Sequence, residues 1–174
     1  MRLTLLPSVM ALLIWAAGPS GADEKPVRHV EKAGGFSFVP PKDWTVKEFP
    51  GLKYKIAHGP AANGFAPNIT FVDEAFQGSL EDYVSANKKT LEKLFKNFKA
   101  ISQADLKTHD GQPAVKLITE SDHNGKLLRQ TFFFFDLAKG KKLVGTGSTL
   151  ADGGEKLDEL FEKALKTVKA EKSE

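Results

Sequence analysis

Four consecutive phenylalanines, Phe132 to Phe135, constrain the fold of this chain more than any other feature. They lie within residues 126–137, where aromatic and branched residues between two turns predict a β-strand. Successive side chains of a strand point to opposite faces of the sheet, so both faces of this strand are aromatic. Burial of each phenylalanine stabilises the fold by about 1.5–3 kcal/mol. We therefore predict an α+β fold in which an antiparallel sheet is covered by helices on both faces, an α/β/α sandwich.

The other elements follow from periodicity and turn residues. Ser79 is a good N-cap, and apolar residues recur at helical spacing after it, so we expect a first helix that ends near Phe98. A second helix is expected after Gly154. Alternating residues and short glycine turns, typical of hairpins and of an antiparallel meander, predict the strands. These are residues 36–39, 45–49, 52–57, 68–76, 101–107, 113–121, 126–137 and 142–149.

The amino-terminal residues have the pattern of an export signal. A positive start at Arg2 precedes an apolar run, and small residues end at Ala22. The run is shorter than the roughly 20 residues that span a bilayer, so we expect a cleaved signal peptide at residues 1–22 and no membrane span in the mature form. The expected location is periplasmic or secreted. Residues 23–34 are polar and predict a flexible lead-in, followed by a single domain at residues 35–170.

Composition excludes several functional classes. The chain has no cysteine, which excludes a disulfide scaffold, a thiolate zinc site and a cysteine nucleophile. Removal of residues 1–22 takes away Arg2 and no acidic residue, so the net charge falls from +3 to +2. Only Arg28 and Arg129 then remain as arginines. The near balance of charge, carried mostly by lysine, argues against a nucleic-acid partner.

Catalytic and metal-binding patterns are weak. Glu120, Asp122 and His123 combine imidazole with carboxylates, which suits zinc or manganese, but the sequence has no spaced histidine pair typical of a chelate. Ser148 does not lie in the strand-to-helix elbow of a serine hydrolase. We therefore predict no catalytic residue, no metal site and no cofactor, and a metal-assisted hydrolase is the least favoured function.

Two surfaces are candidates for contact with a partner. Lysines crowd the second half of the first predicted helix and could attract an anionic partner, or they could form a solvated face near the helix carboxyl end. They are Lys88, Lys89, Lys93, Lys96 and Lys99. The loop at residues 58–67 is rich in glycine and proline and carries His58 and Phe65. Phe65 could meet a partner or fold back on the sheet edge.

The order of motifs resembles a known superfamily. An opening Phe36-x-Phe38-x-x-Pro41-x-x-Trp44, a Gly111-x-Pro113-Ala114 turn and a Thr146-Gly147-Ser148 strand before the closing helix are similar to the PsbP-like, or Mog1/PsbP/DcrB-like, superfamily. The resemblance covers about residues 34–170. It implies an antiparallel sheet between helices and an extracytoplasmic or lumenal binding or assembly factor, with one nuclear branch that binds a small GTPase. It implies no catalytic residues.

These observations predict an exported, non-enzymatic binding or assembly module that recognises a protein partner in the cell envelope. The alternative is a carrier of a small apolar ligand held between the sheet and one helix layer. The thirteen phenylalanines provide enough apolar surface for such a site, although a filled core explains them as well.

Overall fold

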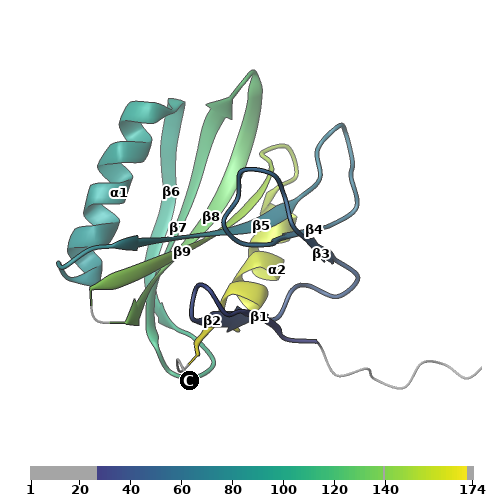
Figure 1. The fold of residues 1–174 in the computed structure, drawn as a ribbon. Coiled ribbons are helices and arrows are strands. Elements are labelled where there is room, and N and C mark those ends of the chain that lie inside the picture. Colours follow the sequence, from purple (N-terminus) through teal and green to yellow (C-terminus); the bar gives the residue numbers. More distant parts are fainter. Residues whose placement is uncertain (1–26, 139, 172–174) are drawn as a thin grey trace, which may run out of the picture.

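The computed structural model describes residues 27–138 and 140–171, which form two antiparallel sheets and two helices (Figure 1). The larger sheet has seven strands in the order β3-β4-β5-β9-β8-β7-β6, and the smaller has the order β1-β2-β10. The helices are α1 (Leu80–Leu94) and α2 (Glu155–Leu165). The strands are β1 (His29–Glu31), β2 (Phe36–Phe38), β3 (Thr45–Lys47), β4 (Ile56–His58), β5 (Asn68–Ala75), β6 (Lys96–Lys107), β7 (Pro113–His123), β8 (Lys126–Ala138), β9 (Lys141–Leu150) and β10 (Lys169–Ala170).

The phenylalanines of β8 are buried on both faces of the sheet. Phe132 and Phe134 belong to a core cluster with Tyr83 of α1. Phe133 and Phe135 belong to a second cluster with Phe161 of α2. Phe133, Phe134 and Phe135 are each 0% exposed. The predicted α+β sandwich, with one helix on each face of an antiparallel sheet, is therefore confirmed (Figure 1).

Two glycines of β9 allow α2 to pack closely on the sheet. A Cβ atom at Gly147 would lie 2.3 Å from the ring of Phe161, and one at Gly145 would lie 2.6 Å from Leu165. Both distances are far below van der Waals contact, so any larger residue would push the helix outwards. The Gly145-Thr146-Gly147 segment is thus a packing feature of the strand under α2.

Helix α1 begins where predicted but ends earlier. The Ser79 hydroxyl accepts from the Asp82 backbone N–H, and the Asp82 carboxylate accepts from the Ser79 backbone N–H, which makes a capping box. The prediction that the helix continues to Phe98 is wrong, because α1 ends at Leu94 and Phe98 lies in β6. Strand β6 pairs with β7 from its first residues, so backbone pairing in the sheet overrides the helical spacing of the apolar residues.

The amino-terminal elements also differ from the predictions. We predicted regular structure only from Gly35, but β1 at His29–Glu31 pairs with β2. The strands predicted at residues 45–49 and 52–57 form a hairpin, but they are shorter than predicted. Only Thr45–Lys47 and Ile56–His58 pair, and residues 48–55 form the loop between them. The proposed signal peptide at residues 1–22 lies outside the described residues. Within the described ranges, no helix is both long and apolar enough to cross a bilayer.

The two-sided burial of β8 predicts which phenylalanine supports the fold. Phe133→Ala should lower the free energy of unfolding by about 3–5 kcal/mol, because it leaves a cavity in a closed core. Phe49→Ala should lower it by less than about 0.5 kcal/mol, because Phe49 is 51% exposed. Urea unfolding of both variants measures the difference, and equal losses would contradict the assignment of the core.

Candidate partner-binding surface

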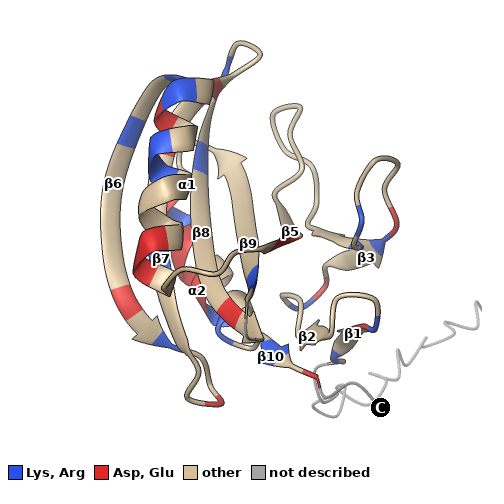
Figure 2. Cartoon of the chain, turned by 60° about the vertical axis from the view of Figure 1, so that its left-hand side comes forward, with Lys and Arg blue, Asp and Glu red and all other residues tan. Residues whose placement is uncertain are grey.

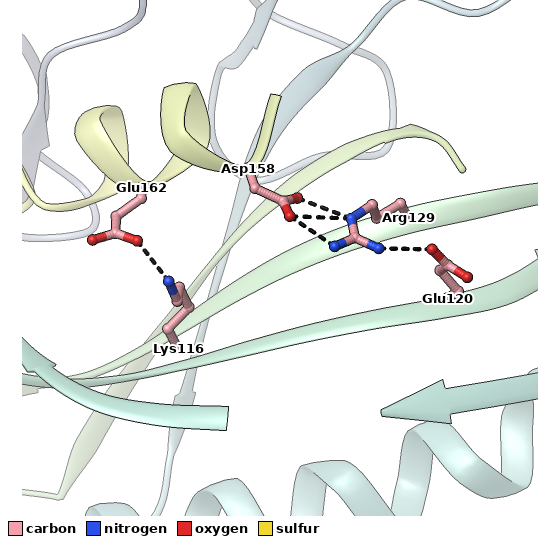
Figure 3. A network of polar contacts seen from close by, with 5 residues as sticks. All are labelled: Lys116, Glu120, Arg129, Asp158 and Glu162. Atoms are coloured by element: carbon pink, nitrogen blue, oxygen red, sulfur yellow. Dashed lines mark hydrogen bonds and ion pairs between the residues drawn. The ribbon is translucent and has the colours of Figure 1, made fainter. Parts of the chain in front are cut away.

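The most deeply placed arginine is bound by two carboxylates. The side chain of Arg129 on β8 is 8% exposed and lies between β7 and α2 (Figure 3). Its Nη1 donates to Glu120 at 2.7 Å, and its Nη2 and Nε donate to Asp158 at 2.8 and 3.0 Å. The bond to Asp158 and then that to Glu120 raise the pKa of Arg129 against the effect of burial. The group joins α2 to the sheet, and each of the three guanidinium nitrogens donates to a carboxylate of the protein.

Other partly buried charges are paired in the same way. Lys116 of β7 reaches Glu162 of α2 at 2.6 Å, and Lys166 binds the other oxygen of Glu162 at 2.6 Å (Figure 3 shows the first pair). Hydrogen bonds from Lys116 and then Lys166 lower the pKa of Glu162. Lys142, which is buried on β9, pairs with Asp136. The charges of these side chains are thus neutralised by partners within the protein, either between α2 and the sheet or between neighbouring strands.

Asp73 on β5 shows the largest effect of pairing on a carboxylate. Its side chain is 6% exposed and lies 2.7 Å from Lys53 and 3.0 Å from Lys141. Burial acts to raise its pKa, but the hydrogen bonds from Lys53 and Lys141 outweigh burial and lower the pKa to about 2. The folded protein therefore favours the ionised carboxylate.

The residues considered for a metal site do not converge. Glu120 points toward α2, where it accepts from Arg129. His123 lies at an odd number of residues from Glu120 on the same strand, so it points to the opposite face, where its Nε2 contacts Ser121 at 3.0 Å. Among the described residues, no group of three or more histidine, aspartate or glutamate side chains is placed to hold a metal ion. The combination of Glu120, Asp122 and His123 thus does not form a site.

The lysines predicted on one helix face are divided between two elements. Lys88, Lys89 and Lys93 lie on α1, whereas Lys96 and Lys99 lie on β6, because the helix ends at Leu94. We call these five residues the lysine corner, since they lie on the last two turns of α1 and at the start of β6, where Figure 2 shows blue segments on both elements. All are exposed except Lys88, which is partly exposed. None makes an ion pair with another residue in the described part of the chain.

The second candidate loop folds into a small hairpin. Ala62 and Phe65 exchange backbone hydrogen bonds of 2.9 and 3.0 Å, and Lys126, the first residue of β8, donates to the Gly64 carbonyl at 2.8 Å. Phe65 is partly exposed on this hairpin. His58 lies at its base in β4, and its Nε2 atom is buried without a hydrogen-bond partner. The two predicted contact residues therefore lie in different surroundings, since Phe65 is on the small hairpin and His58 is in a strand of the large sheet.

A row of polar side chains across the sheet was not predicted. It lies on the α1 face, two residues along β8 from Phe132, and the pairing register brings its members opposite one another. Gln130 Oε1 and Thr119 Oγ1 are buried without a partner, as is His58 Nε2. Each residue is an ordinary polar position in its own strand, so only the register could have joined them. The row consists of Thr45, His58, Asn68, Ser148, Gln130 and Thr119.

A groove of about 720 Å³ lies between α1 and the strands β6 and β7. Leu80 and Val84 of α1 form one side, and Val115 of β7 contributes to its floor. Polar side chains on its rim include Lys88 and Asp105. The groove thus has an apolar floor and charged edges, and it lies beside the lysine corner.

Comparison with known proteins identifies the fold. A scan against protein-family models and a search of curated proteins both find no match. The solved structure of cyanobacterial PsbP (CyanoP) from Synechocystis sp. PCC 6803 matches with a TM-score of 0.61 and 15% identity, over 88% of this chain and 98% of that one. This chain has the PsbP/Mog1-like fold. The resemblance predicted from the motifs is thereby confirmed at the level of the fold.

Two further structures share this fold. The Ran-binding protein Mog1p of Saccharomyces cerevisiae matches with a TM-score of 0.60 and 8% identity, over 84% of this chain and 95% of that one. LpqN, involved in cell envelope biogenesis of Mycobacterium tuberculosis, matches with a TM-score of 0.59 and 16% identity, over 84% and 85% of the two chains. The fold is therefore found in a Ran-binding protein and in a protein involved in cell envelope biogenesis, and at these identities it assigns no residue role here.

The pairing of Asp73 predicts a specific dependence of stability on pH. Because its pKa is lower in the folded state than in the unfolded chain, its contribution is complete above about pH 5 and decreases as the pH falls toward 2. Asp73→Asn should be less stable than the native protein by about 2 kcal/mol at neutral pH, and this difference should shrink on acidification. Urea unfolding of both proteins across this range tests it, and a difference that does not change with pH would contradict it.

The ion pairs at Arg129 predict a contrast with a surface pair. Arg129→Met leaves Glu120 and Asp158 without their cation and should cost about 3 kcal/mol of stability. Lys163→Met removes an exposed pair with Glu159 and should cost less than about 0.5 kcal/mol. Urea midpoints provide the comparison. A similar loss for both variants would show that the Arg129 group does not hold α2 to the sheet.

Proposed function

We propose that this protein is an exported, non-enzymatic binding or assembly module that recognises a protein partner in the cell envelope through the lysine corner. One observation carries the proposal. The partly buried cations Arg129, Lys116 and Lys142 are bound by carboxylates, whereas the five lysines of the corner have no carboxylate partner among the described residues. The lysines lie on both sides of the sheet edge, because Lys96 and Lys99 lie opposite Asp122 and Glu120 of the α2 face by register, whereas the other three lie on α1. Unpaired cations concentrated at such an edge attract an anionic partner and increase its rate of association.

The arrangement of the acidic and histidine side chains supports binding rather than catalysis. General acid and base groups need to converge with a nucleophile or a metal around one point. Here Glu120 and Asp158 bind Arg129, Glu162 binds two lysines, and His123 lies on the other face of the sheet from Glu120. The likeness of the fold to the Ran-binding protein Mog1p and to LpqN agrees with a binding role.

Export is supported by the amino-terminal sequence. The positive start, the apolar run and the small residues up to Ala22 form the pattern of a cleaved signal. We propose that the mature chain begins at Asp23. The partner is then a protein of the periplasm or of an equivalent compartment.

The carrier of a small apolar ligand is the second candidate, and the groove between α1 and β6–β7 is the observation that favours it. The space under both helices is filled by packed side chains such as Tyr83, Phe134 and Phe161, each at most 1% exposed. The groove itself has exposed charged residues on its rim, including Glu81 and Asp105. It suits a segment of polypeptide better than an enclosed apolar molecule.

Charge reversal on the lysine corner tests the proposed function. The triple variant Lys88→Glu, Lys93→Glu, Lys96→Glu should recover at least about tenfold less of the partner than the native protein from an envelope extract, since like charges repel. The matched control reverses three exposed lysines elsewhere and gives the same net charge. It carries Lys32→Glu, Lys42→Glu and Lys156→Glu.

Recovery of the same partner by both triple variants would remove the lysine corner from the proposal. The intact mass of the tagged native protein isolated from the envelope fraction is measured in the same preparation. A mass that corresponds to a chain starting at Asp23 is expected, and an uncleaved mass would contradict export with removal of residues 1–22.

A further inference from the structure

Strand β6 is an open edge of the large sheet. It is the last strand in the sheet order and pairs with β7 on one side only. Ten of its twelve residues are exposed, and no element of the described chain lies along its outer side in Figure 2. In an antiparallel strand, every second residue directs its backbone N–H and C=O away from the paired neighbour. The outer side of β6 therefore presents free donors and acceptors for another strand.

The two halves of β6 differ in regularity. The pairing with β7 is irregular between Lys96 and Lys99 and again between Ala100 and Ser102. Bulges and lysines are devices that prevent an edge strand from pairing indiscriminately. Residues 102–107 pair with β7 without a bulge. The carboxyl-terminal half of β6 is thus the part with the geometry to accept an added strand.

The groove described above lies beside this regular half. Gln103 and Asp105 of β6 line it, and by register they lie opposite Leu117 and Val115 on the α1 face. Alternate side chains of a strand added to β6 would lie on that same face and point toward the groove. Backbone pairing would supply affinity, and contact with the groove wall, which includes Val84, would favour apolar side chains on the added strand.

Charge along the edge constrains the composition of one end of that strand. Lys96 and Lys99 lie at the amino-terminal end of β6 without an acidic residue between them, whereas Asp105 and Lys107 lie together at its other end, as the coloured segments in Figure 2 show. Lys88 lines the groove from the helix side. A strand antiparallel to β6 would bring its own carboxyl-terminal end beside Lys96 and Lys99. Charge complementarity therefore requires acidic residues at that end.

We propose that the edge of β6 is a strand-addition site for an extended segment of the partner protein. The segment runs antiparallel to β6, has small apolar side chains at alternate positions and ends in acidic residues beside the lysine corner. This inference rests on the proposed function, because it specifies how the partner that is attracted by the lysine corner is held.

A synthetic peptide provides the first test. The probe alternates valine and threonine over six residues and ends in two glutamates, and its control has the same residues in reverse order, with the glutamates at the amino end. Addition of the probe to the ¹⁵N-labelled mature protein should slow the hydrogen exchange of alternate backbone amides in residues 102–107 by about tenfold relative to the free protein. The reversed peptide should bind about three to ten times more weakly.

Two helix variants test the role of the groove. Ser85 is exposed and lines the groove, whereas its neighbour Ala86 is exposed and does not. Ser85→Arg should fill the groove and weaken binding of the probe by at least about tenfold, whereas Ala86→Arg should leave it unchanged. Both positions are on the surface, and unchanged urea midpoints would show that both variants fold.

The outcomes separate this inference from the proposed function. Absence of binding by the probe, protection outside β6, equal affinity of the two peptides, or equal effects of the two arginine variants would each overturn strand addition. If the lysine-corner variant still loses the partner in that case, the proposed function stands without strand addition. If instead the probe protects β6 while charge reversal leaves recovery of the partner unchanged, strand addition holds and the lysine corner is not the surface that attracts the partner.

Discussion

Burial of β8 on both faces is the constraint on which the rest of the structure depends. Four adjacent phenylalanines cannot be hidden by one layer, so the chain places α1 over Phe132 and Phe134 and α2 over Phe133 and Phe135. The flanking strands β7 and β9 then have to be covered as well. Glycines in β9 let α2 approach, and the ion pairs of Arg129 fix that helix on the sheet.

This use of the two faces limits where the protein can act. On the α2 face, the carboxylates of Glu120 and Asp158 are paired with Arg129 and hold the helix on the sheet. The lysine corner, which makes no ion pair among the described residues, and the outer side of β6, which pairs with no strand, both lie at the periphery of the sandwich. Under the proposed function, the edge and the corner are the contact surfaces and the packed interior is their rigid support.

Much of the fold could be predicted because its signals are local. The alternation and the glycine turns gave the meander β6–β9, and Ser79 with Asp82 gave the start of α1. The end of α1 could not be predicted, because Phe98 continues the helical spacing while its backbone pairs in the sheet. That boundary changes the proposed contact surface, since it places Lys96 on an edge strand and not on the helix.

The sequence by itself determined that the sheet is covered on both faces, that no thiol chemistry takes place and that lysines gather near residues 88–99. These properties depend on residue type and on spacing along the chain. Only the tertiary structure decided that β6 lies at an edge, that a groove runs beside it and that Gln130 lies opposite Ser148 and Thr119. Strand order and register result from contacts between residues far apart in the chain, and no local pattern encodes them.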